Sequence, residues 1–349
     1  MSFRVPSPES RVPSVHDVVI VGAGPCGLAA AISAGREGLD AVVIDQGPVC
    51  SAITAYPIDA TFFSTAEKLA LGGLPFVLAD AKPTRRDALA YYRAVVTHFG
   101  LRVRQYERVV AIEGTRGAFV VRSETLAGPR ETRCRAVIVA TGYWGSPNLL
   151  GVPGEDLPHV SHIYREGHEA FQRRAVVVGG GNSAAEASLD LWRSGAKVTH
   201  VHFGPSWDMR IKPWVLPDIA NRMKEGSIGV RWNSRVVSIH PDHIVIDTLG
   251  ARDTLPADHV YLMTGFAPNV SLLRDAGVTI DPETGVPAHD PETLETDAPG
   301  LYIVGVVVAG YDANKVFIEN GRYHGDKIVA HLLGRGPAAE QVVSEDPDA

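Results

Sequence analysis

The chain carries two glycine-rich turns of the same kind, and each follows a run of apolar residues typical of a buried strand. The first turn begins at Gly22 and the second at Gly179. Each turn opens an expected helix, so each fits the start of a βαβ unit. The pattern predicts a doubly wound α/β fold with two Rossmann-like units, and therefore a protein that holds two dinucleotides at once.

The first turn has the spacing that a pyrophosphate requires. Gly22 allows the tight turn, Gly24 lets backbone N–H groups approach the phosphates, and Gly27 lets the helix pack on the strand. Pro25 follows within the same turn, and the N–H groups at the helix start supply an anion site. The next apolar strand, 41–44, ends in Asp45. Its carboxylate is expected to accept hydrogen bonds from an adenosine ribose.

The second turn repeats this cradle, with Ala184 in the third, packing position. The strand expected after it, 198–203, ends in His202-Phe203 and carries no carboxylate. A ribose with a 2′-phosphate would be repelled by an acid there, so the second site is expected to take NADPH rather than NADH. The residues expected to bind this nucleotide are Gly179, Gly181, Asn182, Ser183, Ala184 and His202.

Two basic residues beyond this strand, Arg210 and Lys212, are candidate partners of the 2′-phosphate. Asp208 lies among them, and a basic loop is often only a solvated surface. Both interpretations stay open from the sequence alone.

Length and composition restrict the class of protein. A chain of 349 residues is expected to form about two domains, and a net charge of −7 gives no reason to expect nucleic acid as a partner. No apolar run approaches the roughly 18–20 residues needed to span a bilayer. Residues 1–15 lack the apolar stretch of a signal peptide, and we interpret them as a disordered leader of a cytoplasmic protein.

Three cysteines, far apart in the chain, argue against a disulfide-stapled fold or a metal site.

Turn-rich segments divide the chain. Residues 145–148 and 265–269 contain Gly, Pro and Asn, which suit two passages between domains. We therefore expect a discontinuous first domain, 16–146 and 269–349, and a second domain inserted at 147–268.

Residues 296–305 resemble the C-terminal FAD motif of the pyridine nucleotide-disulfide oxidoreductases, in which Gly305 is the last glycine. Thr141-Gly142 and Thr264-Gly265 resemble the strand ends where the chain of that superfamily crosses between its two domains. The resemblance implies FAD at the first turn, with Thr141 and Gly142 beside it, and NADPH at the second. Val306 stands where the superfamily usually has Asp.

The cysteines do not form the dithiol of glutathione or thioredoxin reductases. Cys50 lies near where one such motif would begin, but position 55 is Ala55, and no cysteine follows Cys134. Cys26 is different, because it lies inside the first turn at a helix start. The helix dipole favours a thiolate there, whereas a pyrophosphate opposes it. Cys26 is therefore either a redox thiol or a small apolar filler.

A C-terminal helix is expected to begin at Lys315, capped by Asp312 or Asn314 and broken at Asn320-Gly321. In the superfamily the corresponding helix points its N-terminus at the flavin. The resemblance therefore places Asn314 and Lys315 at the cofactor, where Lys315 would stabilise reduced flavin. The alternative is a surface helix end with an incidental lysine.

Several stretches together resemble one subfamily, the bacillithiol-disulfide reductase-like flavoproteins, over residues 17–332. The stretches are Gly22-Ala-Gly-Pro-Cys-Gly27, Tyr56-Pro57, 61–65, 177–184, 214–218, 314–322 and 324–325. The resemblance implies that Cys26 is a redox thiol, that NADPH reduces the disulfide of a small thiol, and that the protein is a homodimer. Val306 fits this subfamily, whereas Phe203 stands where its members tend to have Arg.

The main hypothesis is therefore an FAD-dependent NADPH oxidoreductase that acts on a low-molecular-weight disulfide. An electron carrier is the alternative acceptor, as in ferredoxin- or flavodoxin-NADP reductases. A flavin monooxygenase is suggested by 140–147 with His162 and Tyr164, but Leu157-Pro158-His159 replaces its usual start. A regulatory binder without turnover is the alternative outside the enzymes.

Overall fold

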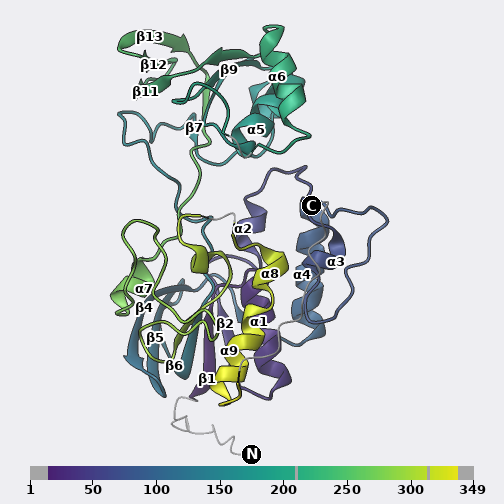
Figure 1. The fold of residues 1–349 in the computed structure, drawn as a ribbon, viewed down its shortest axis with the longest axis vertical. Helices are drawn as coiled ribbons and strands as arrows, with labels where there is room; N and C mark the ends of the chain where they lie inside the picture. Colours follow the sequence, from purple (N-terminus) through teal and green to yellow (C-terminus); the bar gives the residue numbers. More distant parts are fainter. Residues whose placement is uncertain (1–14, 209–210, 313–314, 337–349) are drawn as a thin grey trace, which may run out of the picture.

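The computed structural model describes residues 15–208, 211–312 and 315–336. They form two α/β units, one above the other in Figure 1. The lower unit contains the N-terminal third of the chain and its C-terminal part, and the upper unit contains the middle segment. The predicted leader, apart from Val15, lies outside the described residues, as do Arg210, Asn314 and 337–349.

The lower unit is built on a seven-stranded sheet with the order β3-β2-β1-β6-β5-β4, to which β15 adds beside β6. β1, β2, β3, β6 and β15 pair in parallel, whereas β4 and β5 form an antiparallel extension of β6. The apolar residues that suggested strands are buried in the centre of this sheet. The strands are β1 His16–Val21, β2 Ala41–Ile44, β3 Val103–Arg104, β4 Arg108–Thr115, β5 Ala118–Thr125, β6 Gly128–Val139 and β15 Leu301–Ile303.

Helices cover the lower sheet, and the first and last of them pack together (Figure 1). A side chain at Gly325 would lie 2.5 Å from the Cα of Ala30, so glycine permits this close approach. The Ser33 hydroxyl also donates to Asp326 at 2.6 Å. The helices are α1 Pro25–Arg36, α2 Ser51–Thr54, α3 Ala66–Leu69, α4 Arg85–His98, α7 Ser271–Asp275, α8 Ile318–Gly321 and α9 His324–Leu332, with a 3-10 turn at Gly305–Ala309.

The upper unit contains a parallel sheet with the order β10-β9-β8-β14-β7 and a separate antiparallel sheet, β11-β12-β13. Its strands are β7 Val160–Ser161, β8 Arg174–Val178, β9 Lys197–Val201, β10 Gly229–Arg231, β11 Ser234–Ile239, β12 His243–Thr248, β13 Ala251–Pro256 and β14 His259–Leu262. Its helices are α5 Asn182–Arg193 and α6 Leu216–Lys224, with a 3-10 turn at His168–Ala170.

The two segments expected to connect the units lie side by side. The Asn148 N–H donates to the carbonyl of Gly265 at 3.0 Å, and the Ala267 N–H donates to the carbonyl of Ser146 at 2.9 Å. The Thr264 hydroxyl donates to the Asn148 carbonyl at 2.6 Å. The passages are therefore a hydrogen-bonded pair. The boundaries at 146/147 and 268/269 stay a prediction.

Two predicted elements differ from those observed. The strand expected at 198–203 ends at Val201, because the next residues bond to the chain between Arg231 and Ser234. The helix expected to begin at Lys315 begins at Ile318. Its start is set by Asn320, whose side-chain oxygen accepts from the Phe317 N–H at 2.8 Å. The Asn320 amide also donates to the carbonyl of Lys315 at 3.0 Å, which holds that residue outside the helix.

Candidate dinucleotide cleft

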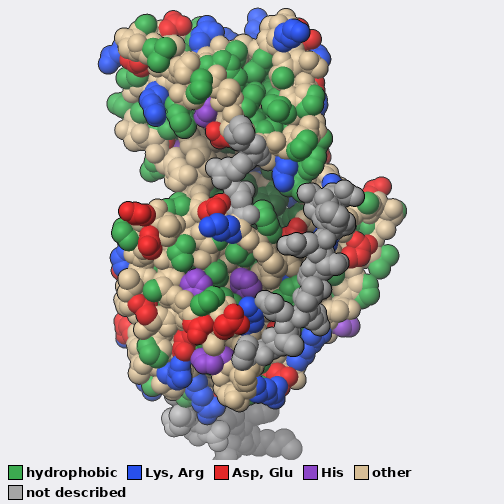
Figure 2. Space-filling model, viewed as in Figure 1, with side chains coloured by type: hydrophobic (Ala, Val, Ile, Leu, Met, Phe, Trp, Pro, Cys, Tyr) green, Lys and Arg blue, Asp and Glu red, His purple; other side chains and the backbone are tan. Residues whose placement is uncertain are grey.

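One continuous cavity of about 3240 Å³ runs along both glycine turns. It exceeds the roughly 300–1,000 Å³ of an ordinary small-molecule pocket. Gly22 and Gly24 line it from the lower unit, and Gly179 and Gly181 line it from the upper unit. Figure 2 shows that the molecule narrows where the two units meet. The cavity is therefore large enough to bring two dinucleotides together.

The first turn has the shape expected of a phosphate cradle. Gly22 has a φ of +115°, and a side chain there would clash with the carbonyl of Ala140. A side chain at Gly27 would clash with the carbonyl of Gly22, whereas Gly24 has no atom within 4 Å of its missing Cβ. The two outer glycines therefore bring helix and strand together, and the middle one leaves backbone open to the cavity.

Asp45 lies at the end of β2, is buried and lines the cavity. Its carboxylate accepts from the N–H groups of Ala23 at 2.6 Å and Gly47 at 2.8 Å, and from the Ser51 hydroxyl at 3.3 Å. Burial raises the pKa of Asp45, and the two backbone donors act in the opposite direction. A carboxylate offers about four lone-pair sites, so Asp45 supports the turn and retains capacity for a ribose hydroxyl.

Cys26 is half-buried and lines the same cavity. Burial and the Glu319 carboxylate raise the pKa of its thiol to about 12, so the thiol is neutral near pH 7. Side chains at Gly305 and Gly321 would come within 3.2 Å and 2.8 Å of its sulfur, so both glycines leave room for it. Cys50 and Cys134 are buried and free, and neither lines the cavity.

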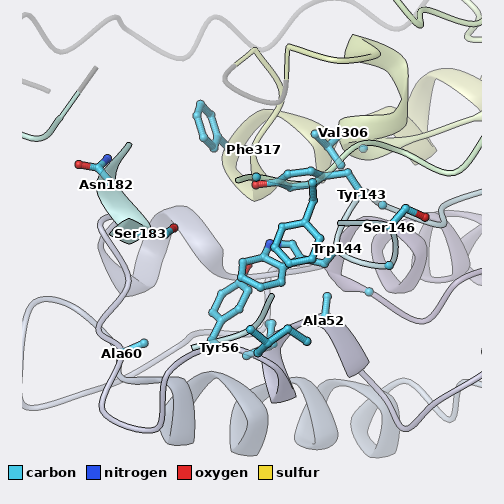
Figure 3. A pocket seen from close by; sticks show the side chains of 18 of the residues that line it. Ala52, Tyr56, Ala60, Tyr143, Trp144, Ser146, Asn182, Ser183, Val306 and Phe317 are labelled. Atoms are coloured by element: carbon cyan, nitrogen blue, oxygen red, sulfur yellow. The ribbon is translucent and has the colours of Figure 1, made fainter. Parts of the chain in front are cut away.

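An aromatic cluster that the sequence reasoning missed lines the cavity between the units. The ring of Trp144 stacks on Phe266 with a centroid distance of 4.6 Å and lies 4.9 Å from the ring of Tyr56. Figure 3 shows Tyr56, Tyr143 and Trp144 close together. The signal in the sequence was weak: Tyr143 and Trp144 directly precede the first passage, and Phe266 lies within the second.

Thr141 and Gly142 begin the first passage and line the cavity. Gly142 has a φ of +67° and nothing within 4 Å of its missing Cβ. The end of β6 therefore opens directly into the cavity, as the resemblance implies.

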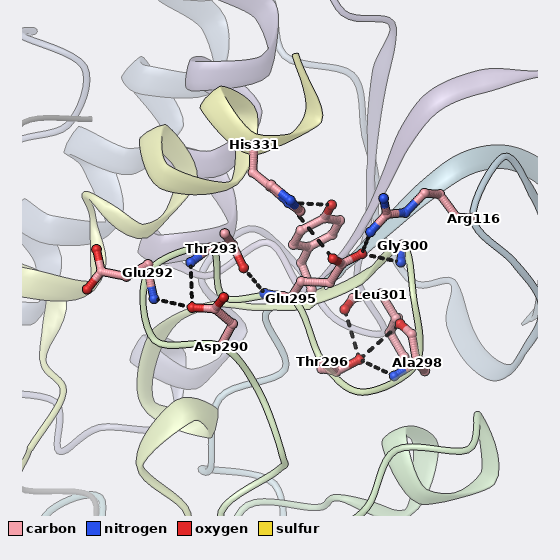
Figure 4. A network of polar contacts seen from close by, with 11 residues as sticks. Arg116, Asp290, Glu292, Thr293, Glu295, Thr296, Ala298, Gly300, Leu301 and His331 are labelled. Carbon is pink, nitrogen blue, oxygen red and sulfur yellow. Dashed lines mark hydrogen bonds and ion pairs between the residues drawn. The ribbon is translucent and has the colours of Figure 1, made fainter. Parts of the chain in front are cut away.

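The segment before β15 is held by a polar network (Figure 4). The Glu295 carboxylate accepts from Arg116 and, at 2.5 Å, from the Gly300 N–H. The Thr296 hydroxyl donates to the carbonyl of Leu301 at 2.9 Å. This network fixes the turn that leads into β15 and so delivers Gly305 to the cavity.

Gly305 has a φ of +73°, and its N–H donates to His324 Nδ1 at 3.2 Å. Val306, next in the chain, also lines the cavity (Figure 3). Lys315 does not line it: its ammonium lies 3.8 Å from the Asp312 carboxylate, and its side chain is exposed.

The second turn repeats the cradle. Gly179 has a φ of +149°, and a side chain there would clash with the carbonyl of Met263. Asn182 begins α5, and its side-chain oxygen accepts from the Lys212 N–H at 2.8 Å. Ser183 lines the cavity (Figure 3), and Ala184 is fully buried. Asn182 therefore links the turn to the loop that follows β9.

His202 lies directly beneath this turn. It is 3 % exposed, and any side chain at Gly180 would clash with its ring. Burial lowers the pKa of His202, although Asp208 acts in the opposite direction, so the ring is neutral near pH 7. The Lys212 ammonium lies 5.0 Å from the ring centre of Phe63 and 5.8 Å from that of Trp214.

A family model described as pyridine nucleotide-disulphide oxidoreductase matches residues 19–305. The chain belongs to this family. The bacilliredoxin reductase Bdr of Bacillus subtilis is 42% identical over 91% of this chain and 97% of its own. The solved bacillithiol disulfide reductases Bdr from Bacillus cereus and Staphylococcus aureus are 41% and 37% identical, with TM-scores of 0.90 and 0.86. Each of these two matches covers 92% of this chain and 99% of the solved chain.

Membership of the pyridine nucleotide-disulphide oxidoreductase family confirms the predicted fold class and the resemblance to the bacillithiol-disulfide reductases. A thioredoxin reductase from T. acidophilum, 22% identical with a TM-score of 0.71, shares the fold. The chain is an oxidoreductase of a family whose members bind FAD and NADPH. The open backbone at Gly24 and the buried carboxylate of Asp45 fit one of these dinucleotides, and the second cradle fits the other.

None of the helices in the described part of the chain is long and apolar enough to cross a membrane.

Proposed function

We propose that this protein uses NADPH to reduce the disulfide of a low-molecular-weight thiol of the bacillithiol type. The observation that carries the proposal is the similarity to the Bdr reductases along almost the whole chain. The cavity supports it, because it joins both glycine turns and exposes one cysteine, Cys26, among the described residues that line it.

The two turns divide the cofactors between them. Gly22 and Gly24 would hold the pyrophosphate of FAD at the first turn, and Asp45 would hold its adenosine ribose. Gly179 and Gly181 would hold the pyrophosphate of NADPH at the second turn. Bound FAD would supply the two-electron transfer from NADPH to the disulfide, which amino-acid side chains alone do not provide.

Cys26 is the residue that we assign to the disulfide. Its thiolate attacks one sulfur of the substrate, which forms a mixed disulfide and releases the first thiol, and the proton lost by Cys26 ends on that thiol. A hydride equivalent from NADPH, which is two electrons and one proton, together with one further proton from solvent would then release the second thiol and restore Cys26. Because burial and Glu319 raise the pKa of this thiol to about 12, only a small fraction of Cys26 is thiolate near pH 7.

The test is NADPH oxidation by the purified, flavin-containing protein in the presence of bacillithiol disulfide. Cys26→Ala is expected to keep its flavin and to lose disulfide reduction by at least about 100-fold. Cys134→Ala is the matched control, because Cys134 is buried in β6 and does not line the cavity. Full activity of Cys26→Ala would remove the thiol from the mechanism but leave the reductase, whereas no activity in the unaltered protein would contradict the proposal.

An electron carrier is the second candidate acceptor. The cavity of the described chain exposes no pair of cysteines, so transfer without a thiol is chemically consistent with it. A ferredoxin-NADP reductase of Ignicoccus hospitalis is 28% identical over 85% of this chain. Fast NADPH-dependent reduction of ferredoxin, unchanged in Cys26→Ala, would favour this alternative.

The homodimer that the resemblance implies and the cytoplasmic location expected from the sequence are also part of this proposal. Sedimentation of the purified protein and cell fractionation would test these two expectations.

A further inference from the structure

The residue that recognises the 2′-phosphate of NADPH is not evident from the second glycine turn, and this inference rests on the proposed use of NADPH. In a βαβ unit the end of the second strand faces the adenosine ribose. Here β9 ends beside His202, which is buried and neutral, and Phe203, which is 60 % exposed. Neither side chain can pair with a phosphate as a cation.

Arg235 supplies a cation at this position from another strand. It is exposed and is the second residue of β11. The Ser234 N–H donates to the carbonyl of His202 at 2.9 Å, which brings the start of β11 to the end of β9. The Arg235 guanidinium lies 4.8 Å from the ring centre of Phe203, and both residues line the cavity with Gly180 and Gly181.

The guanidinium has no counter-ion in the described part of the chain. The neighbouring Arg231 differs, because its Nε lies 3.9 Å from the Asp253 carboxylate. Phe203 therefore holds the Arg235 guanidinium by a cation–π contact, and the N–H groups of the guanidinium stay available. A guanidinium forms two parallel hydrogen bonds to a phosphate, which a lysine ammonium does not.

We propose that Arg235, held in place by Phe203, binds the 2′-phosphate of NADPH and sets the preference for NADPH over NADH. The Lys212 ammonium is placed elsewhere, over the rings of Phe63 and Trp214. The competing group is Asp208, which also lines the cavity and lies 3.8 Å from His202 Nε2. If Asp208 rather than Arg235 faces the ribose, its carboxylate binds the free 2′-hydroxyl of NADH and repels the 2′-phosphate of NADPH.

The experiment measures binding of NADP⁺ and NAD⁺ to the oxidised, flavin-containing protein by calorimetry. The two ligands differ only in the 2′-phosphate, and neither reduces the flavin. Arg235→Ala is expected to weaken NADP⁺ binding about 10- to 100-fold and to change NAD⁺ binding less than about threefold, since one charge-assisted interaction is lost. Arg231→Ala is the matched control and is expected to change neither.

A second substitution tests the placement of the charge. Phe203→Arg in the Arg235→Ala protein puts a guanidinium at the end of β9 and is expected to restore most of the NADP⁺ affinity. Equal weakening of both nucleotides by Arg235→Ala, or no weakening of either, would overturn the assignment and leave the proposed reductase intact. Tighter binding of NAD⁺ than NADP⁺ by the unaltered protein would overturn it in favour of Asp208. A protein that binds neither nucleotide would instead contradict the proposed function.

Discussion

The two glycine turns have nearly the same backbone and very different surroundings. In both, a side chain at the first glycine would clash with the carbonyl of the residue that follows a neighbouring strand. That residue is Ala140 after β6 at the first turn and Met263 after β14 at the second. Beside the first turn a buried carboxylate, Asp45, accepts from the N–H of Ala23 within the turn and from the N–H of Gly47 after β2. Beside the second turn a neutral imidazole, His202, fills the same space without a charge.

This comparison shows what the glycine spacing determines and what it leaves to other residues. The spacing creates a phosphate cradle in both places, because it removes side chains where helix and strand must meet. In our proposal, a group beside the strand end then decides which ribose is accepted, and this group is Asp45 at the first turn and Arg235 at the second. The residue that follows each strand also decides how firmly the turn is held, because Asp45 ties its turn to the sheet by hydrogen bonds whereas His202 acts by filling space.

The largest expected effect comes from closing the first cradle. Gly27→Val places a side chain against the carbonyl of Gly22 and is expected to abolish flavin binding and to destabilise the fold by about 3 kcal/mol or more. The flavin-to-protein absorbance ratio and thermal unfolding measure both. Gly35→Ala on the same helix is the control, because nothing lies within 4 Å of its missing Cβ. A Gly27→Val protein with full flavin would show that the first turn is not the flavin site.

The second cradle is expected to fail independently of the first. Gly180→Ala clashes with the His202 ring and is expected to weaken NADP⁺ binding at least about 10-fold while the flavin is retained. Calorimetry of the oxidised protein measures this. Adding His202→Ala should remove the clash and recover part of the affinity. Loss of flavin in Gly180→Ala would show that the two turns are not separable.

Removing the carboxylate beside the first turn should have a smaller effect. Asp45→Ala leaves the N–H groups of Ala23 and Gly47 without their acceptor, and we expect a loss of about 1–3 kcal/mol in unfolding free energy together with weaker flavin binding. Asp45→Asn keeps one acceptor oxygen, so its unfolding free energy should lie between those of the unaltered protein and Asp45→Ala. Chemical denaturation with and without added FAD separates stability from affinity. An unchanged midpoint in Asp45→Ala would contradict the supporting role.

The pH dependence of Cys26 alkylation tests the burial of this thiol in the unaltered protein, without any substitution. Its thiol pKa of about 12 lies above the working range, and only the thiolate reacts. The alkylation rate at Cys26, followed by peptide mass spectrometry, should therefore rise about tenfold per pH unit from roughly pH 7 to 10. A plateau within that range would mean that the thiol is already ionised and that burial does not control it.

The sequence predicted those parts of the site that depend on local spacing. The glycine turns and the strands β1, β2 and β8 all follow from residues close together in the chain. The structure places Asp45, Thr141, Gly142 and Gly305 at one cavity, as the motifs indicated.

Contacts between distant residues were not predictable in the same way. Arg235 meets Phe203 only because β11 returns to the end of β9, and Trp144 meets Phe266 only because the two passages pair. The sequence predicts that the C-terminal helix begins at Lys315, whereas α8 begins at Ile318. The reason is that the side chain of Asn320 accepts a hydrogen bond from the Phe317 N–H. In each case the interaction that decides the structure is absent from any single motif.

The most direct measurement of the central claim is an anaerobic titration of the purified protein with NADPH, followed through its flavin absorbance. If the two turns hold FAD and NADPH in one cavity, the protein is isolated yellow and NADPH bleaches it in a stoichiometric, saturating way. A colourless protein that takes up no added FAD, or a bound flavin that NADPH leaves oxidised, would contradict the account.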